Sequence, residues 1–167
     1  MRKSLLLLLL VASLGVAQTA THKAAAKSKS AKPATHAAGI TTPDSIKWGD
    51  PPPVFAAGAQ FAVLSGNPMA AGPYVVRLKL PDGYKIMPHW HPAQENVTVI
   101  SGELHVAMGD KFAEAGMHAL PPGGFAPIPA HAHHYAMAKG ETVVQVHGMG
   151  PFKLTYVNPS DDPSKKK

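Results

Sequence analysis

The chain has 167 residues and a formal net charge of +6, but 9 of its 16 basic residues lie before residue 41 or in the last three positions. Between Thr41 and Pro163, 7 basic residues stand against all 10 acidic ones, a net charge of −3, which excludes nucleic-acid binding by this central part on charge grounds. The sequence contains no cysteine, which excludes a disulfide framework and a cysteine nucleophile.

The first 17 residues have the pattern of a secretory signal peptide. Arg2 and Lys3 form a charged start, an apolar run begins at Leu5, and the small residues Gly15 and Ala17 provide a cleavage site. The apolar run is shorter than the roughly 20 residues that a membrane-spanning helix needs, so no membrane span is expected. We therefore expect an exported protein, either periplasmic or secreted, of bacterial origin.

Residues 18–40 are rich in alanine, lysine, serine and threonine and contain almost no large apolar side chain. Such a composition buries too little surface to fold, so this segment is expected to be a disordered spacer. The alternative is a basic arm for an anionic surface such as a cell envelope or nucleic acid, but no aromatic residue interleaves its lysines. A short basic tail, residues 161–167, ends the chain.

Residues 41–160 predict one all-β domain. Short runs rich in β-branched residues alternate with Pro, Gly and Asp turns, and no helical stripe of useful length interrupts them. Residues 42–68 are expected to add edge strands or a dimer arm. The main expected strands are Tyr74–Leu80, Asn96–Ile100, Glu103–Met108, Thr142–His147 and Phe152–Val157. Many short strands with turns between them favour a sandwich or a closed barrel.

His89, His91 and Glu95 form a candidate metal site. Because alternate side chains of a strand share a face, His89 and His91 point the same way, and Trp90 points the other way. Pro92 breaks the strand, and a short turn can return Glu95 to the same ion. Imidazoles with one carboxylate suit divalent iron, manganese, nickel, copper or zinc, and suit calcium or magnesium poorly. The alternative for an isolated His-x-His pair is two surface histidines on a strand.

Glycines frame these three residues. The order is Gly83, five residues, His89, Trp90, His91, three residues, Glu95, six residues and Gly102. This spacing resembles, position for position, the first sequence motif of the cupin superfamily. The resemblance implies an all-β double-stranded β-helix, or jelly-roll, barrel in which His89, His91 and Glu95 are three of four metal ligands.

The stretch from Gly123 to His134 resembles the second cupin motif, and the resemblance implies that His134 is the fourth ligand. Two positions depart from the family pattern: His131 stands where the family usually has glycine, and Ala138 where it often has asparagine. His131 and His133 are alternatives to His134 as the ligand, and they share strand parity with each other and not with His134. A solvated loop rich in histidine is the remaining interpretation.

The resemblance also implies a function. Cupin metal sites leave positions open for water or substrate, which favours a metal-dependent enzyme acting on a small organic molecule. An oxidoreductase of the oxygenase type is expected ahead of an isomerase or lyase, with Glu95 as a catalytic base in addition to its ligand role. The alternative is a non-catalytic cupin that binds a small ligand or sequesters metal. Cupins commonly form homodimers through edge strands, so a homodimer is also implied.

Two polar residues of the strand after the second motif are candidate pocket residues. Gln145 and His147 lie at one parity of the predicted strand, while Val144 and Val146 lie at the other. The polar pair is therefore expected either to line the pocket or to face solvent, and the sequence favours neither.

Overall fold

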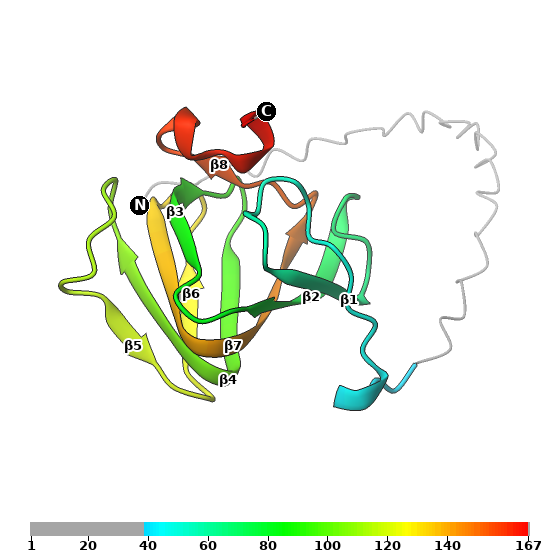
Figure 1. The fold of residues 1–167 in the computed structure, drawn as a ribbon. Coiled ribbons are helices and arrows are strands. Elements are labelled where there is room, and N and C mark those ends of the chain that lie inside the picture. Colours follow the sequence, from blue (N-terminus) through cyan, green and yellow to red (C-terminus); the bar gives the residue numbers. More distant parts are fainter. Residues whose placement is uncertain (1–38, 167) are drawn as a thin grey trace, which may run out of the picture. The chain divides into compact units, whose positions relative to one another are not determined.

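The computed structural model describes residues 39–166, which contain eight strands and three short 3-10 helices (Figure 1). The predicted signal peptide and nearly all of the predicted spacer lie outside the described residues. Among residues 39–166, no helix is long and apolar enough to cross a membrane. The elements are η1 (Pro43–Ser45), β1 (Gln60–Ser65), β2 (Gly72–Leu80), β3 (Lys85–Trp90), β4 (Glu95–Met108), β5 (His118–Leu120), β6 (Phe125–Ile128), β7 (His134–Gly150), β8 (Thr155–Tyr156), η2 (Pro159–Asp161) and η3 (Pro163–Lys165).

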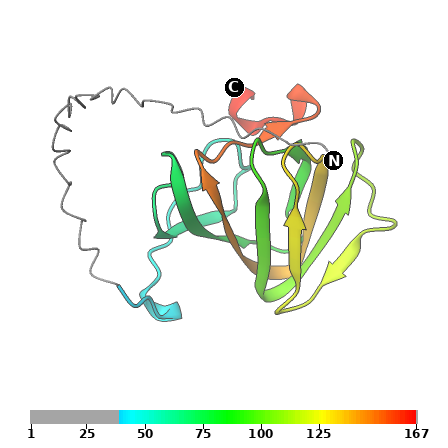
Figure 2. The ribbon, with the colours of Figure 1, turned by 180° about the vertical axis from the view of Figure 1, so that it is seen from behind.

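The two longest strands, β4 and β7, pair antiparallel along their length and form a bent ribbon (Figures 1 and 2). Glu95 at the start of β4 lies opposite Gly148, and Met108 at the end of β4 lies opposite His134 at the start of β7. The pairing register shifts on both sides of Ser101. The ribbon therefore bends near its middle.

Shorter strands complete a jelly-roll barrel on the two halves of this ribbon. β2 pairs with the second half of β7 and carries β1 on its other edge. β3 pairs with the first half of β7 and carries β8, while β6 and β5 pair with β4. The predicted all-β jelly-roll fold is confirmed, and β1 is an edge strand of the kind expected within residues 42–68.

The predicted strands agree with the structure except at the end of the chain. Tyr74–Leu80 lies inside β2, Thr142–His147 lies inside β7, and the two strands predicted on either side of Ser101 are halves of β4. The predicted strand Phe152–Val157 is wrong except for the two residues of β8. Its first residue leaves the sheet because the Phe152 N–H donates to the carbonyl of Pro68, which lies in a loop, at 2.6 Å.

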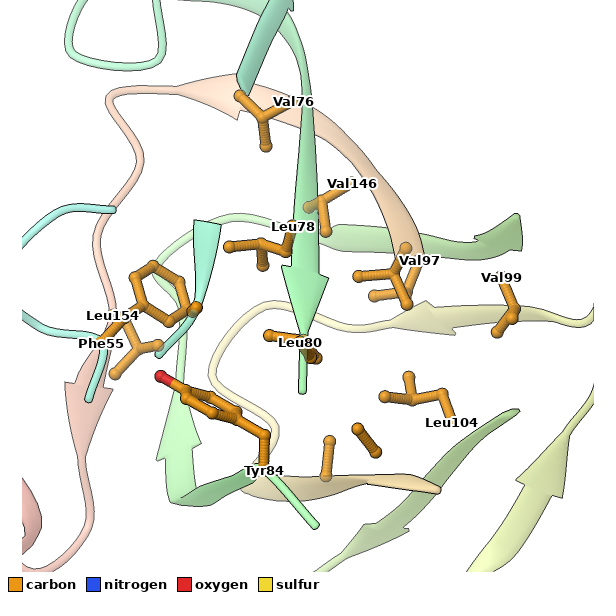
Figure 3. Packing of buried hydrophobic residues seen from close by; sticks show 14 of the residues in the cluster. Phe55, Val76, Leu78, Leu80, Tyr84, Val97, Val99, Leu104, Val146 and Leu154 are labelled. Carbon is orange, nitrogen blue, oxygen red and sulfur yellow. The ribbon is translucent and has the colours of Figure 1, made fainter. Parts of the chain in front are cut away.

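Alternate side chains of β2, β4 and β7 fill the barrel (Figure 3). The buried set includes Val76, Leu78, Leu80, Val97, Val99, Val144 and Val146. Because Val144 and Val146 point inward, Gln145 and His147 lie on the outer face of β7. The interpretation that they line the pocket is wrong, and Gln145 Oε1 instead accepts a hydrogen bond from Arg77 Nε at 3.2 Å.

The segment before β1 is held on the barrel by Phe55 and by two tyrosines. Phe55 is buried in the core. The hydroxyl groups donate to carbonyl oxygens on either side of it, Tyr156 to Val54 and Tyr84 to Ala56, both at 2.8 Å. Burial raises the pKa of Tyr84 to about 12, so its hydroxyl keeps the proton that it donates at neutral pH.

Gly102 and Thr142 hold the bend of the ribbon. Gly102 has a φ of +74°, and a Cβ atom there would lie 2.6 Å from Thr142 Oγ1 and 2.7 Å from Thr142 Cα. The fully buried Thr142 hydroxyl donates to the Glu103 carbonyl at 3.0 Å and accepts from the Glu103 N–H at 3.2 Å. Glycine is therefore required at position 102, because the backbone there is left-handed and Thr142 leaves no room for a Cβ atom.

Gly102→Ala is expected to lower the free energy of unfolding by about 3 kcal/mol, because the methyl group adds a clash with backbone atoms to an unfavourable φ. Gly83→Ala is the matched control, since Gly83 has a φ of +71° but open space within 4 Å of an added Cβ. Only conformational strain of about 1 kcal/mol is expected there. Urea unfolding of both variants measures the difference, and equal losses would contradict the steric argument.

Candidate metal centre

β3 presents two histidines to the inside of the barrel. His89 lies near the end of β3, opposite His134 of β7, and the two rings are 4.1 Å apart between centroids. His91 follows the strand directly, and its ring centroid is 5.0 Å from that of His89. Trp90 points away and packs against His131 with ring centroids 5.1 Å apart. The predicted alternation of these side chains is therefore present.

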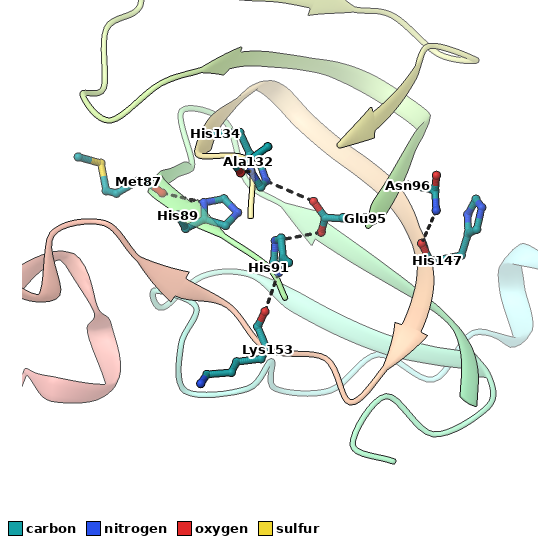
Figure 4. Close-up of polar contacts among 9 residues, drawn as sticks. All are labelled: Met87, His89, His91, Glu95, Asn96, Ala132, His134, His147 and Lys153. Atoms are coloured by element: carbon teal, nitrogen blue, oxygen red, sulfur yellow. Dashed lines mark hydrogen bonds and ion pairs between the residues drawn. The ribbon is translucent and has the colours of Figure 1, made fainter. Parts of the chain in front are cut away.

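Glu95 reaches the same point from the first position of β4. Its Oε1 lies 3.5 Å from His91 Nε2 and its Oε2 lies 3.3 Å from His134 Nε2 (Figure 4). All three histidines are buried, and the Glu95 side chain is 12% exposed. The turn at residues 92–94 thus returns the carboxylate to the two histidines, as the sequence predicts.

Backbone carbonyls fix the orientation of all three rings. Nδ1 lies 2.8 Å from Met87 O in His89, 2.8 Å from Lys153 O in His91 and 3.0 Å from Ala132 O in His134. A carbonyl accepts only, so each Nδ1 carries a proton and donates it. Each ring therefore leaves its Nε2 free to face the centre of the group, the arrangement typical of metal-binding histidines.

The structure separates the three candidate histidines of the second motif. His134 is the one that joins the buried group. His133 Nδ1 lies 2.6 Å from Asp110 Oδ1 near the surface, and the exposed His131 packs on Trp90. The structure therefore favours His134 for the fourth position over the two alternatives, and its role as a ligand stays a prediction.

His131 has a left-handed backbone conformation, which glycine adopts readily. It has a φ of +63°, the one positive value at a non-glycine residue in the described part of the chain. Its N–H donates to the His91 carbonyl at 2.8 Å. The departure from the motif thus leaves the turn before His134 intact, at the cost of a left-handed conformation that a residue with a Cβ rarely adopts.

Burial and mutual proximity set the charges of the site. Burial, with the His134 and His91 rings beside it, lowers the pKa of His89 from 6.5 to about 3. Burial raises the pKa of Glu95, but His91 and His134 outweigh it and lower the value from 4.5 to about 2. At neutral pH the centre therefore holds a neutral His89 and an ionised Glu95, the protonation states that bind metal.

The residues present fit a divalent transition metal. One ring nitrogen from each of His89, His91 and His134 lies within 4.8 Å of the other two. His91 Nε2 is buried and forms no hydrogen bond within residues 39–166, and Oε1 of the Glu95 carboxylate lies 3.5 Å away from it. Three imidazoles and a carboxylate suit iron, manganese, nickel, copper or zinc.

The centre has an apolar side and a polar side. His89, Glu95 and His134 line a cavity inside the barrel together with 13 apolar residues. His91 and Glu95 also line a smaller, polar hollow with Tyr74, Gln94 and Lys153. A bound ion would therefore face hydrocarbon on one side and polar groups on the other.

The sequence matches, over residues 21–155, the family described as a domain of unknown function, DUF4437. The chain belongs to this family. No curated protein matches the sequence.

Solved structures show that the fold of this DUF4437 protein is that of the cupins. The polyketide cyclase RemF from Streptomyces resistomycificus is 17% identical, with a TM-score of 0.62 over 76% of this chain and 90% of that one. A candidate acetylacetone dioxygenase from Methylibium petroleiphilum PM1 is 20% identical, with a TM-score of 0.58 over 75% and 84%. An RmlC-like cupin from Shewanella frigidimarina is 18% identical, with a TM-score of 0.53 over 66% and 88%.

Sequence reasoning missed the carbonyl groups that orient the rings. Met87 and Ala132 each lie two residues before the histidine they hold, a local relation that depends on backbone geometry and leaves no mark in residue type. Lys153 lies 62 residues from His91 and meets it only through the fold. Phe55, which lines the cavity from outside the sheet, was also missed because the segment around it has no strand pattern.

The metal-free DUF4437 protein is expected to lose stability as the pH falls from 6.5 to about 4. Over this range the unfolded chain protonates at His89 and the folded protein does not, so protons favour unfolding; below 4.5 Glu95 acts in the same direction. Thermal unfolding in the presence of a chelator measures the effect. His89→Gln should flatten the profile, whereas the exposed His118→Gln should not, and the same slope in both variants would contradict the assignment.

Proposed function

We propose that this DUF4437 cupin is a metal-dependent enzyme acting on a small organic molecule inside its barrel, with His89, His91, His134 and Glu95 as the metal ligands. The convergence of three Nε2 atoms, each oriented by a carbonyl at Nδ1, carries the proposal. A cluster built only for stability would satisfy these buried atoms within the protein, and His91 Nε2 is left without a partner among residues 39–166.

Oxidation by dioxygen is the reaction type we favour, ahead of isomerisation or lysis. Of the solved structures that share this fold, the candidate acetylacetone dioxygenase is named for such a reaction, whereas the polyketide cyclase is named for a cyclisation. A bound transition metal supplies Lewis acidity and, for a redox-active ion, one-electron chemistry. An apolar cavity beside the histidines suits a small organic substrate, because it excludes water from the reacting atoms.

Glu95 is the residue of this chain best placed to move a proton. It is ionised at neutral pH, and it lines both the apolar cavity and the polar hollow. A carboxylate in that position can accept a proton from a bound molecule and pass it to the polar side. In the proposed enzyme it therefore acts as both ligand and base.

Metal analysis tests the ligand set. We expect about one equivalent of iron, manganese, nickel, copper or zinc in protein purified without added metal and analysed by inductively coupled plasma mass spectrometry. His134→Ala should lose most of it, and so should His91→Ala, because each removes one of four ligands. His133→Ala is the matched control and should retain it, since His133 lies near the surface beside Asp110. Equal retention in all three variants would contradict the site.

Glu95→Gln tests the proposed base. The amide keeps the shape and one oxygen ligand but cannot take up a proton, so at least half of the metal should remain while turnover falls 100-fold or more, on the order expected for a general base. Oxygen uptake with a panel of small enolic and phenolic compounds is the measurement. Full metal occupancy in the unmodified protein without turnover of any compound would favour the alternative, a non-catalytic cupin that binds a small ligand or holds metal.

A further inference from the structure

The cavity inside the barrel has an unusually one-sided lining. Of the 16 residues around it, 13 are apolar and the other three are His89, Glu95 and His134. Within residues 39–166, no lysine or arginine side chain contributes to this wall. Among the described residues, the polar side chains that a molecule in the cavity meets are therefore those of the metal centre.

This lining selects against a second charged group. A molecule held by one polar end at the centre would place the rest of its atoms against valine, leucine and isoleucine side chains. A charge at the far end would lose its hydration without gaining a partner. An uncharged hydrocarbon part gains from the same burial, by about fourfold in affinity for each methylene group.

The space is small. The cavity has a volume of about 40 Å³, where a single water needs roughly 10–15 Å³ on the same measure. A hydrocarbon part of about three or four carbon atoms fits without movement of the wall. A longer one requires that part of the wall give way.

Phe55 is one of two residues of the wall that do not lie on a paired strand. Of the lining residues, 14 lie on strands whose positions are fixed by backbone pairing, and only Phe55 and Leu154 lie outside them. Both belong to the buried cluster whose packing Figure 3 shows. Phe55 is held in place by the tyrosine hydrogen bonds to the carbonyls of Val54 and Ala56, so its large ring has a defined position in the cavity wall.

We propose that the barrel takes a small uncharged molecule, bound by one oxygen-bearing end at the metal centre with a short hydrocarbon part in the cavity, and that Phe55 limits the size of that part. The binding of one end of the molecule at the metal rests on the proposed function. The apolar chamber and the role of Phe55 rest on the lining itself.

Alkyl hydroxamates bound to the cobalt-loaded protein test the proposal, with affinity measured by titration calorimetry. Butanohydroxamate should bind more than 10-fold tighter than acetohydroxamate, for two added methylene groups. Octanohydroxamate should bind more weakly than butanohydroxamate, and the monohydroxamate of succinic acid, whose tail ends in a carboxylate, should bind at least 10-fold more weakly. Affinities that do not change with tail length, or equal affinity for the charged tail, would overturn the apolar chamber.

Phe55→Leu should shift the optimum toward longer tails, and Phe55→Ala should shift it further if that variant folds. Phe125→Leu is the matched control, because Phe125 is 50% exposed and lies outside the lining. An unchanged optimum in Phe55→Leu, or the same shift in Phe125→Leu, would overturn the role of Phe55.

Cobalt content, measured on the same samples, separates this proposal from the proposed function. If the protein does not take up cobalt, the proposed metal site is rejected. Xenon binding to the metal-free protein, followed by ¹²⁹Xe NMR, then tests the apolar chamber alone. A xenon shift that changes in Phe55→Leu and stays constant in Phe125→Leu would support the chamber. A protein that takes up no xenon would overturn it.

Discussion

The bend of the β4–β7 ribbon is the constraint on which the site depends. Glu95 and His134 stand at opposite ends of the paired region, and a straight ladder of this length would hold them about 40 Å apart. In the folded protein their side chains are 3.3 Å apart, because the ribbon turns back on itself at Gly102. The same bend closes the barrel around its apolar interior. The bend therefore determines both the fold and the site. Gly102, the second glycine of the first motif, contributes to the site through this bend and not through contact with the ligands.

The buried polar group is costly to the protein by itself. Three imidazoles and a carboxylate leave water, and part of the penalty is offset by the carbonyls that accept from each Nδ1. The His91 Nε2 atom is not compensated within the described residues. Neutral His89 and ionised Glu95 add a further dependence on pH. An ion that accepts all four lone pairs would remove this deficit, so binding and stability are linked in the proposed metalloprotein.

The sequence predicted what depends on spacing and alternation, and missed what depends on approach in space. The period of two placed His89 and His91 on one face, and Pro92 with the following turn returned Glu95 to them. The two halves of β4 were predicted as separate strands. A glycine that ends a strand and a glycine that bends a strand look the same in an amino-acid sequence. Phe152 joins a loop carbonyl that no local pattern reveals. His131 looked like a departure from the motif, yet its left-handed backbone preserves the geometry that glycine usually supplies.

The two sides of the centre divide the tasks of the proposed enzyme between different parts of the fold. On one side of the centre, apolar side chains of the strands line the cavity that would hold a substrate. These side chains cannot transfer protons. Tyr74 and Lys153 lie on the other side, where burial and the adjacent Glu95 raise the pKa of Tyr74 to about 12 and keep its hydroxyl protonated. Glu95 is the residue common to both sides. In the proposed enzyme, a proton taken from a molecule in the apolar cavity therefore has a route through one carboxylate to polar surroundings, and it need not cross the hydrocarbon that confers selectivity.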